Sequence, residues 1–153
     1  MKTVTGSLLS PKVDGLKLIL NIVSNFNAHK PYGFNYLVYK KYPFCWNLYN
    51  EKINNGSTFL GDFLFCKVES DILLANIIAK DGKWHPEYNP QATRYDKIEE
   101  SFKKIFDYMA GREYTVHINY PNKRSGINSD RLKELLKSEF FDKGKQVYLY
   151  LSC

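Results

Sequence analysis

The stretch of residues 61–80 constrains the fold more than any other part of the chain. It holds two runs of strand-like composition, 62–68 and 72–79, joined by the polar break 69–71. The second run, Ile-Leu-Leu-Ala-Asn-Ile-Ile-Ala, is almost unbroken by polar side chains. Such a strand is apolar on both faces and must be covered on both, as the central strands of α/β sheets are. We therefore expect an α/β fold built around this strand.

This central strand ends on a cation, Lys80, and the following Asp81-Gly82 is typical of a turn. Open α/β sheets bind ligands beyond the C-terminal ends of their strands. Lys80 is therefore either a functional cation at such a site or a solvated lysine at the end of a strand. This stretch alone leaves both interpretations open.

Strands and helices alternate along the rest of the chain. Apolar runs predict further strands at 2–5, 16–23, 114–118 and 146–151. Helices are predicted from 33 to about 42, from 93 to about 110, and from Ser129 or Asp130 to about 140. In the second of these Thr93 is the expected N-cap, and Asp96, three residues on, forms a capping-box-like pair with it. Residues 44–59 are predicted to be irregular. Short connections between alternating elements predict one domain over 1–153, a three-layer α/β/α sandwich.

Composition limits the possible partners and compartments. The net charge of +6 comes from scattered basic residues, which suits a phosphate-bearing ligand better than a duplex-DNA surface. Three cysteines without ligand spacing give no sign of a disulfide framework or a structural zinc site. No metal and no cofactor are expected. The N-terminus lacks a signal-peptide pattern, and no apolar run is long enough to span a membrane. We expect a soluble cytoplasmic monomer, in the host cytoplasm if the source is viral.

Three polar loops, 24–33, 80–82 and 119–128, follow predicted strands. Two of them contain glycine and precede a helix, so all three are expected at one edge of the sheet. Backbone amides of two such loops can clamp a diphosphate, and the amide side chains of Asn25 and Asn128 suit ribose hydroxyls.

The order and spacing of these segments resemble the macrodomain family, the ADP-ribose-recognising α/β/α module. The resemblance covers nearly the whole chain and is carried by five segments: VTGSLL, LILNIVSNFNAHKPYGFNYLVYKKYP, GDFLFCKVESDILLANIIAK, TRYDKIEESFKKI and VHINYPNKRSGINSDRLKELL. It implies a mixed sheet between helices. It also implies that the partner is ADP-ribose or an ADP-ribosylated macromolecule.

The resemblance also assigns ligand-binding positions. Asn25 matches the residue that contacts the distal ribose, and the turn that embraces the phosphates matches residues 125–127. The full implied set is Gly6, Ser7, Leu8, Asn25, Gly33, Phe34, Ser125, Gly126, Ile127 and Asn128. Two departures weaken the pattern: Ser7 replaces an Asp that reads adenine in most members, and the glycine-rich loop is reduced to residues 30–33.

Catalytic positions implied by the resemblance are Lys80 and Asn128. Lys80 matches a lysine that attacks ribose C1″ in macrodomains that strip terminal ADP-ribose from protein carboxylates. Asn128 stands where those hydrolases have an acidic residue, and an amide cannot transfer protons as a carboxylate does. Asp130 lies two residues on, where a helix N-cap role is expected.

Three functional classes follow from these features. The first is an enzyme that removes ADP-ribose from modified macromolecules or dephosphorylates ADP-ribose 1″-phosphate, and Lys80 favours it. The second is a binding module for ADP-ribose or a related nucleotide, which Asn128 and the reduced glycine loop favour. The third is a scaffold that has kept the fold and no longer binds the ligand.

Overall fold

The computed structural model describes residues 1–26 and 31–151. Within these residues the elements alternate much as the sequence predicts. They are β1 (Lys2–Thr5), β2 (Lys17–Ser24), α1 (Phe34–Lys41), α2 (Pro43–Asn54), β3 (Phe63–Glu69), β4 (Ile72–Lys80), α3 (Tyr95–Tyr108), β5 (Thr115–Asn119), α4 (Ser129–Glu139), the short 3₁₀-helix η1 (Phe141–Lys143) and β6 (Val147–Leu151).

The strands form one mixed sheet in the order β1-β6-β5-β2-β4-β3. Neighbouring strands are parallel except for β3 and β4, which pair antiparallel. A tight turn suffices for that one pair, whereas each parallel pair needs a longer crossover. Strand β2 lies between β5 and β4, so the carboxyl ends of these three strands meet at one edge.

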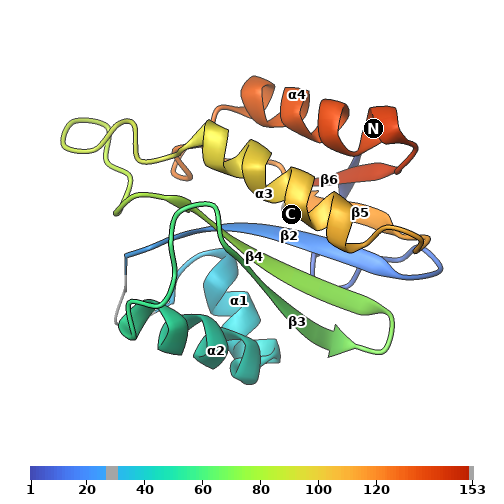
Figure 1. The fold of residues 1–153 in the computed structure, drawn as a ribbon, viewed down its shortest axis with the longest axis horizontal. Coiled ribbons are helices and arrows are strands. Elements are labelled where there is room, and N and C mark those ends of the chain that lie inside the picture. The colour runs from blue at the N-terminus through green and yellow to red at the C-terminus, as the bar shows by residue number, and fades with distance from the viewer. Residues whose placement is uncertain (27–30, 152–153) are drawn as a thin grey trace.

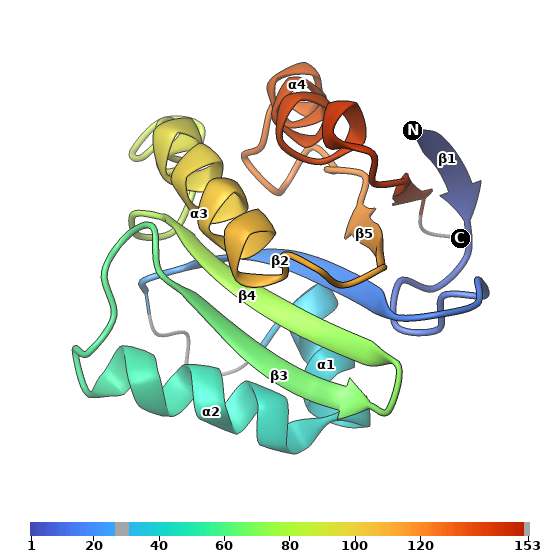
Figure 2. The same ribbon diagram turned by 45° about the vertical axis from the view of Figure 1, so that its right-hand side comes forward.

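Helices cover both faces of the sheet, with α3 and α4 on one face and α1 and α2 on the other (Figures 1 and 2). Leu18 and Leu20 of β2 pack in a cluster with Phe102 of α3, while Ile19 packs in a second cluster with Val38 of α1. Successive residues of the strand therefore point to opposite helical layers. The three-layer α/β/α prediction is confirmed, and β4 is covered on both faces as expected.

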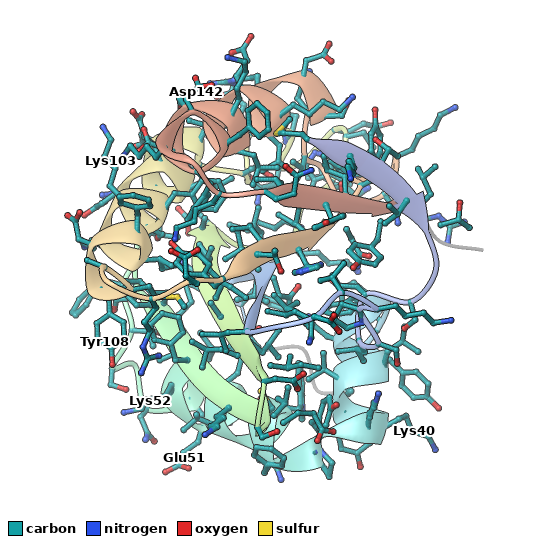
Figure 3. The ribbon with its side chains drawn as sticks, turned by 90° about the vertical axis from the view of Figure 1, so that its right-hand side faces the viewer. Lys40, Glu51, Lys52, Lys103, Tyr108 and Asp142 are labelled. Carbon is teal, nitrogen blue, oxygen red and sulfur yellow. The ribbon has the colours of Figure 1, made fainter. Side chains whose placement is uncertain are left out.

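Charged side chains lie on the outer surfaces of both helical layers. Figure 3 shows Lys103 and Asp142 projecting from the α3–α4 layer, and Lys40, Glu51 and Lys52 from the α1–α2 layer. This division between an apolar inner face and a charged outer face is typical of helices that pack on a sheet.

The prediction that residues 44–59 are irregular is wrong, because most of this segment forms α2. Pro43 occupies the first turn of the helix, where its missing N–H is tolerated. Trp46, Tyr49 and Ile53 recur at helical spacing and pack together with the sheet. Tyr42 caps the end of α1 and the start of α2, so the signal for the end of one helix also marked the start of the next.

Two predicted helix caps also differ from the structure. The N-cap of α3 is Arg94, and the hydroxyl of Thr93 donates instead to the carbonyl of Gly126 at 2.9 Å. The N-cap of α4 is Asn128, whose side chain accepts from the amide of Arg131 at 3.0 Å. In both cases the capping residue lies next to the predicted one, and the change affects the loops at the edge of the sheet.

Candidate functional site

The three loops predicted to meet at one edge of the sheet do so. The backbone amide of Asn25 donates to the carbonyl of Lys80 at 3.0 Å, which joins the first loop to the end of β4. Lys80 also pairs with Thr93 in an antiparallel bridge, and the hydroxyl of Thr93 reaches the carbonyl of Gly126 in the third loop. Asn25, Lys80 and Gly126 are thus linked through neighbouring residues, as the fold prediction requires.

A cavity of about 690 Å³, which we call the inner cavity, opens between these loops. Its walls come from the ends of β2 and β4, from the start of α1, from the loop after β4 and from the loop after β5. Among the predicted site residues it is lined by Lys80, Gly33, Phe34, Ser125 and Ile127.

Lys80 lies at the wall of the inner cavity as the last residue of β4. Its ammonium group makes no hydrogen bond or ion pair with any residue that the structure describes. Burial lowers the pKa of Lys80 from its ordinary value of 10.5 to about 8. A cation in this state is partly neutral near physiological pH, and it forms no ion pair with a described carboxylate that would hold its proton.

The inner cavity carries a net positive charge. Lys80, Lys83 and Arg124 line it, and none of the described residues in its wall is acidic. The first amides of α1 also open toward it, since Gly33 and Phe34 line the cavity and such amides have no intrahelical partners. Cations together with a helix N-terminus favour an anionic ligand such as a diphosphate.

Gly33 has a backbone conformation that few other residues adopt. Its φ is 61° and its ψ is −136°, and a Cβ at this position would meet nothing within 4 Å. The glycine is therefore required by the backbone rather than by space. It turns the chain into α1 and leaves room beside the first amides of the helix.

Gly126 is required for a different reason. Its φ is +71°, and a Cβ would lie 2.2 Å from Cγ of Trp84. The indole of Trp84 therefore lies directly against the backbone of the 119–128 loop. Ser125 stabilises this loop further, since its hydroxyl donates to the carbonyl of Asn122 at 2.8 Å and accepts from the amide of Ile127 at 3.2 Å.

Asn25 and Asn128, both predicted to contact ribose, are engaged with their own chain. The side chain of Asn25 accepts from the amide of Gly82 at 2.8 Å and donates to Asp81 at 3.0 Å, so it holds the turn after β4. Asn128 caps α4 and its amide donates to the hydroxyl of Tyr95 at 2.7 Å. Neither residue lines the inner cavity.

Residues Gly6, Ser7 and Leu8 follow β1 and do not line the inner cavity either. The amide of Gly6 donates to the carbonyl of Leu151 at 3.4 Å, and the hydroxyl of Ser7 accepts from the amide of Leu9 at 3.3 Å. Leu8 is buried in the core on the α1 side of the sheet. This loop lies beyond β6 and β5 from the end of β2, which separates it from Lys80.

Several residues of the cavity wall were not singled out from the sequence. Lys83 and Trp84 come from the loop after β4, of which only residues 80–82 were singled out from the sequence. A tryptophan within a polar loop containing glycine and proline was the signal that could have identified it. Asn21 and Asn35 also line the cavity, and the amide of Asn21 donates to Asn35 at 2.9 Å. They add neutral hydrogen-bonding groups to a cationic wall.

The described residues hold no group of three or more His, Cys, Asp or Glu side chains that could bind a metal ion. None of the helices in the described part of the chain is long and apolar enough to cross a membrane.

Neither the known protein-family models nor the curated proteins give a significant sequence match. Solved structures do match. A protein from Bacteroides thetaiotaomicron has a TM-score of 0.88 at 21% identity, over 100% of this chain and 99% of that one. A macrodomain protein from Streptomyces coelicolor has a TM-score of 0.82 at 23% identity, over 98% of this chain and 97% of that one. Thermosipho africanus DarTG, solved in complex with ADP-ribose, has a TM-score of 0.64 at 10% identity, over 89% of this chain and 38% of that one. The chain therefore has the macrodomain fold, and the resemblance is confirmed at that level.

Proposed function

We propose that this protein binds an ADP-ribosyl group in the inner cavity and hydrolyses its linkage to an acceptor through Lys80. The observation that carries the proposal is the position of Lys80. It is largely buried in the wall of a cavity that suits phosphates, and its ammonium group makes no hydrogen bond or ion pair with a described residue. The solved structure of a DarTG protein with the same fold contains ADP-ribose, which supports this choice of ligand.

The diphosphate is the part of the ligand that the wall fits best. Lys83 and Arg124 supply positive charge, and the first turn of α1 at Gly33 supplies backbone amides. No acidic residue among the described lining opposes the phosphates. Asn35 offers its side-chain NH2 group to a ribose or a base, since its Oδ1 already accepts from Asn21. These interactions hold the ligand without a metal ion.

Lys80 supplies the nucleophile. With its pKa lowered to about 8, about a tenth of the molecules carry a neutral amine at about pH 7, roughly 300 times more than for a lysine of ordinary pKa. The amine attacks C1″ of the distal ribose, the bond from C1″ to the acceptor oxygen breaks, and the new ammonium releases a proton to water. Water then attacks C1″, the bond from C1″ to Nζ breaks, and the departing amine takes up a proton as ADP-ribose is released with a hydroxyl at C1″.

The lack of an acidic residue in the described cavity wall limits the acceptors that can leave. A leaving group that needs a proton would require a general acid, and Asn128 cannot provide one. Carboxylates and phosphates leave as stable anions without protonation. The proposed substrates are therefore ADP-ribosyl esters of carboxylates, or ADP-ribose linked through C1″ to a phosphate.

Kinetics on an ADP-ribosylated protein and on ADP-ribose 1″-phosphate test this proposal. Lys80→Ala and Lys80→Arg should both lose turnover, since a guanidinium stays protonated, while ADP-ribose affinity stays within a few-fold of wild type. Lys83→Ala is the matched comparison and should raise KM with kcat retained. Ring opening of the C1″ adduct gives an imine, which a hydride reductant should trap as a stable lysyl–ADP-ribose adduct at Lys80. Wild-type turnover by Lys80→Ala would refute the lysine mechanism.

Asn128→Asp tests the remaining position implied by the resemblance. Aspartate caps helices as well as asparagine does, so the variant should keep its stability. If leaving groups depart unprotonated, its rate on carboxylate and phosphate esters should equal that of wild type. A large gain in rate would mean that an acid at this position is used, and the leaving-group argument would then fail.

A non-catalytic ADP-ribose-binding module is the second candidate. It is favoured by the engagement of Asn128 as a helix cap and by the non-acidic lining of the described cavity wall. Calorimetry with ADP-ribose, ADP and AMP separates it from the enzyme. Tight binding of ADP-ribose by a wild-type protein that releases nothing from any ADP-ribosyl substrate would establish the module.

A further inference from the structure

Strand β3 forms one edge of the sheet, and its outer side is open. Among the described strands it pairs only with β4, and the order of strands ends there. The pairing is antiparallel and regular from Phe63, opposite Ile77, to Lys67, opposite Leu73. An open strand edge presents a row of unpaired backbone N–H and C=O groups, to which a further strand can bind.

A bulge at the start of β3 shows which backbone groups face outward. The amide of Gly61 donates to the carbonyl of Ile78 at 2.8 Å, and the amide of Ile78 donates to the carbonyl of Asp62 at 2.8 Å. In an antiparallel pair, residues that bond to the neighbouring strand alternate with residues whose backbone groups point away from it. Counting on from Asp62, the even-numbered residues bond to β4. The backbone groups that face the open side, where no described residue bonds to them, belong to residues 63, 65 and 67.

The side chains of these outward residues form an aromatic stripe on the α3 side of the edge. Phe63 and Phe65 are half-buried, with ring centres 5.1 Å apart. The ring of Tyr108 on α3 lies 5.0 Å from that of Phe65 and is 69% exposed. Lys67 ends the stripe, is exposed and makes no ion pair with a described residue. The edge therefore combines unpaired backbone groups with accessible aromatic surface and a cation.

A second copy of β3, related by a two-fold axis at Phe65, satisfies all of these outward backbone groups. In this register Phe65 lies opposite Phe65 of the second copy, and Phe63 lies opposite Lys67 of the second copy. Each outward residue then faces another outward residue, so every outward N–H and C=O group has a partner. An axis at Leu64 or Cys66 would instead place Lys67 or Phe63 opposite a bulged end of the other strand.

The side chains and their charges favour the same register. Two phenylalanines face each other at the axis, and aromatic pairs on adjacent strands are stabilising. Lys67 lies opposite a phenylalanine ring, which attracts a cation. An axis at Lys67 would place two cations directly opposite each other, which is destabilising. The position of the charge therefore agrees with the pattern of open backbone groups.

We propose that two copies of this chain associate through antiparallel pairing of their β3 strands, with the two-fold axis at Phe65. The sheet then continues from one copy into the other, whereas the sequence predicts a monomer. A paired edge of this length, flanked by Tyr108, is an interface of about 1,000 to 1,200 Å² in total, which corresponds to a weak dimer with a micromolar Kd. The proposal does not depend on the proposed function, since no residue from 61 to 69 lines the inner cavity.

Sedimentation equilibrium from about 1 μM to about 0.3 mM tests the association, and wild type should change from monomer to dimer over this range. Phe65→Glu should weaken association at least about tenfold, because two carboxylates face each other at the axis. The matched control is Tyr36→Glu, which puts the same charge in place of an exposed ring on α1. Tyr36 lies beside Lys40, which projects on the opposite side of the molecule from Tyr108 (Figure 3), so this control should associate as wild type does.

Charge complementation tests the register, because residue 65 meets itself across the axis. Phe65→Glu and Phe65→Lys should each be monomeric, and an equimolar mixture should restore a dimer with one copy of each. Lys67→Pro is a second variant that keeps both phenylalanines. The N–H of residue 67 points outward, so proline is tolerated in the monomer, yet it removes two bonds between the copies. It should weaken association at least about tenfold with its thermal unfolding little changed.

Amide hydrogen exchange provides an independent readout. The N–H groups of residues 63, 65 and 67 should exchange fast in the monomer and become at least about tenfold slower as the protein concentration rises. Those of residues 64 and 66 should be protected throughout, because they bond to β4. A wild type that stays monomeric at about 0.3 mM would overturn the proposal, even if it bound an extended peptide at this edge instead. A dimer that survives Phe65→Glu, or a mixture that fails to restore association, would overturn it as well.

Discussion

Replacing Lys80 with methionine should stabilise the folded protein near neutral pH. The folded state lowers the pKa of Lys80 from 10.5 to about 8, so burial disfavours the ammonium form. Each pKa unit equals about 1.4 kcal/mol, which sets an upper limit of about 3.5 kcal/mol on the destabilisation. Because Lys80 is partly exposed to the cavity, solvent reduces this figure, and we expect a gain of about 1 to 3 kcal/mol.

The gain in stability from Lys80→Met should depend on pH, because the charge of Lys80 differs between the folded and unfolded states over a limited pH range. Below about pH 8 the lysine is charged in both the folded and unfolded states, so the folded state carries the full burial cost. Between about pH 8 and 10.5 the folded state is neutral while the unfolded state still binds the proton. The cost therefore declines through this range. The free energy of unfolding of Lys80→Met should exceed that of wild type most at neutral pH and equal it above about pH 10.5.

Urea unfolding of both proteins at about pH 7 and about pH 9.5 measures the effect, and the difference between them should shrink by up to about 2 kcal/mol. Lys52→Met is the control, since Lys52 is exposed on α2 and its replacement should change stability by less than about 0.5 kcal/mol. A Lys80→Met protein no more stable than wild type at neutral pH would show that the ammonium is well solvated, and the argument for a nucleophilic lysine would have no basis.

Three further predictions concern the site and the core. For hydrolysis, kcat/KM should rise with pH as a single ionisation and level off above about pH 8, which a pH–rate profile of wild type checks. Gly126→Ala should destabilise the fold by about 2 to 4 kcal/mol and change Trp84 fluorescence, whereas Gly111→Ala, with φ +84° and open space, should cost only about 1 to 2 kcal/mol. His117 is fully buried, and burial lowers its pKa to about 4. Stability should therefore fall by up to about 3 kcal/mol as pH drops from about 6.5 to 4, and His117→Gln should flatten this profile in acid unfolding.

Strand positions could be predicted from the sequence because burial on both faces leaves little ambiguity. The run that became β4 is apolar almost throughout, and no solvent-facing element tolerates that composition. The helix α2 was missed because its polar and aromatic residues mix on the surface, and its buried set is small. Tyr42-Pro43 was interpreted as the end of a helix, and the few apolar residues at helical spacing after it were too weak a pattern to predict a second one.

The position of Lys80 at the edge of the sheet could also be predicted from the sequence. The C-terminal ends of parallel strands all lie at the same edge, and Lys80 ends such a strand. Side-chain direction was not predictable for Asn25, because an amide can bind a ribose or its own backbone equally well. Here it holds Asp81 and Gly82 in the turn after β4. Local hydrogen bonding of this kind competes with ligand binding wherever asparagine lies in a loop.

The loop after β4 shows what sequence patterns leave out. Its shape depends on His85, whose Nδ1 accepts from the amides of Glu87 and Tyr88, and on Asn89, whose side chain donates to the carbonyls of Asp81 and Lys83. These contacts are specific to this chain and follow no periodic pattern. They hold the loop in which Lys83 and Trp84 reach the cavity wall.

The choice between enzyme and binding module depends on what Lys80 does for each. A module that only holds a diphosphate gains most from a cation that stays charged, and an arginine or an exposed lysine provides that at less cost. Lys80 is instead placed where burial disfavours its charge and no described anion restores it. A neutral amine is useful for attacking carbon and of little use for binding phosphate. The cost to stability at this position is therefore an argument for catalysis, and measuring that cost tests the argument without any substrate.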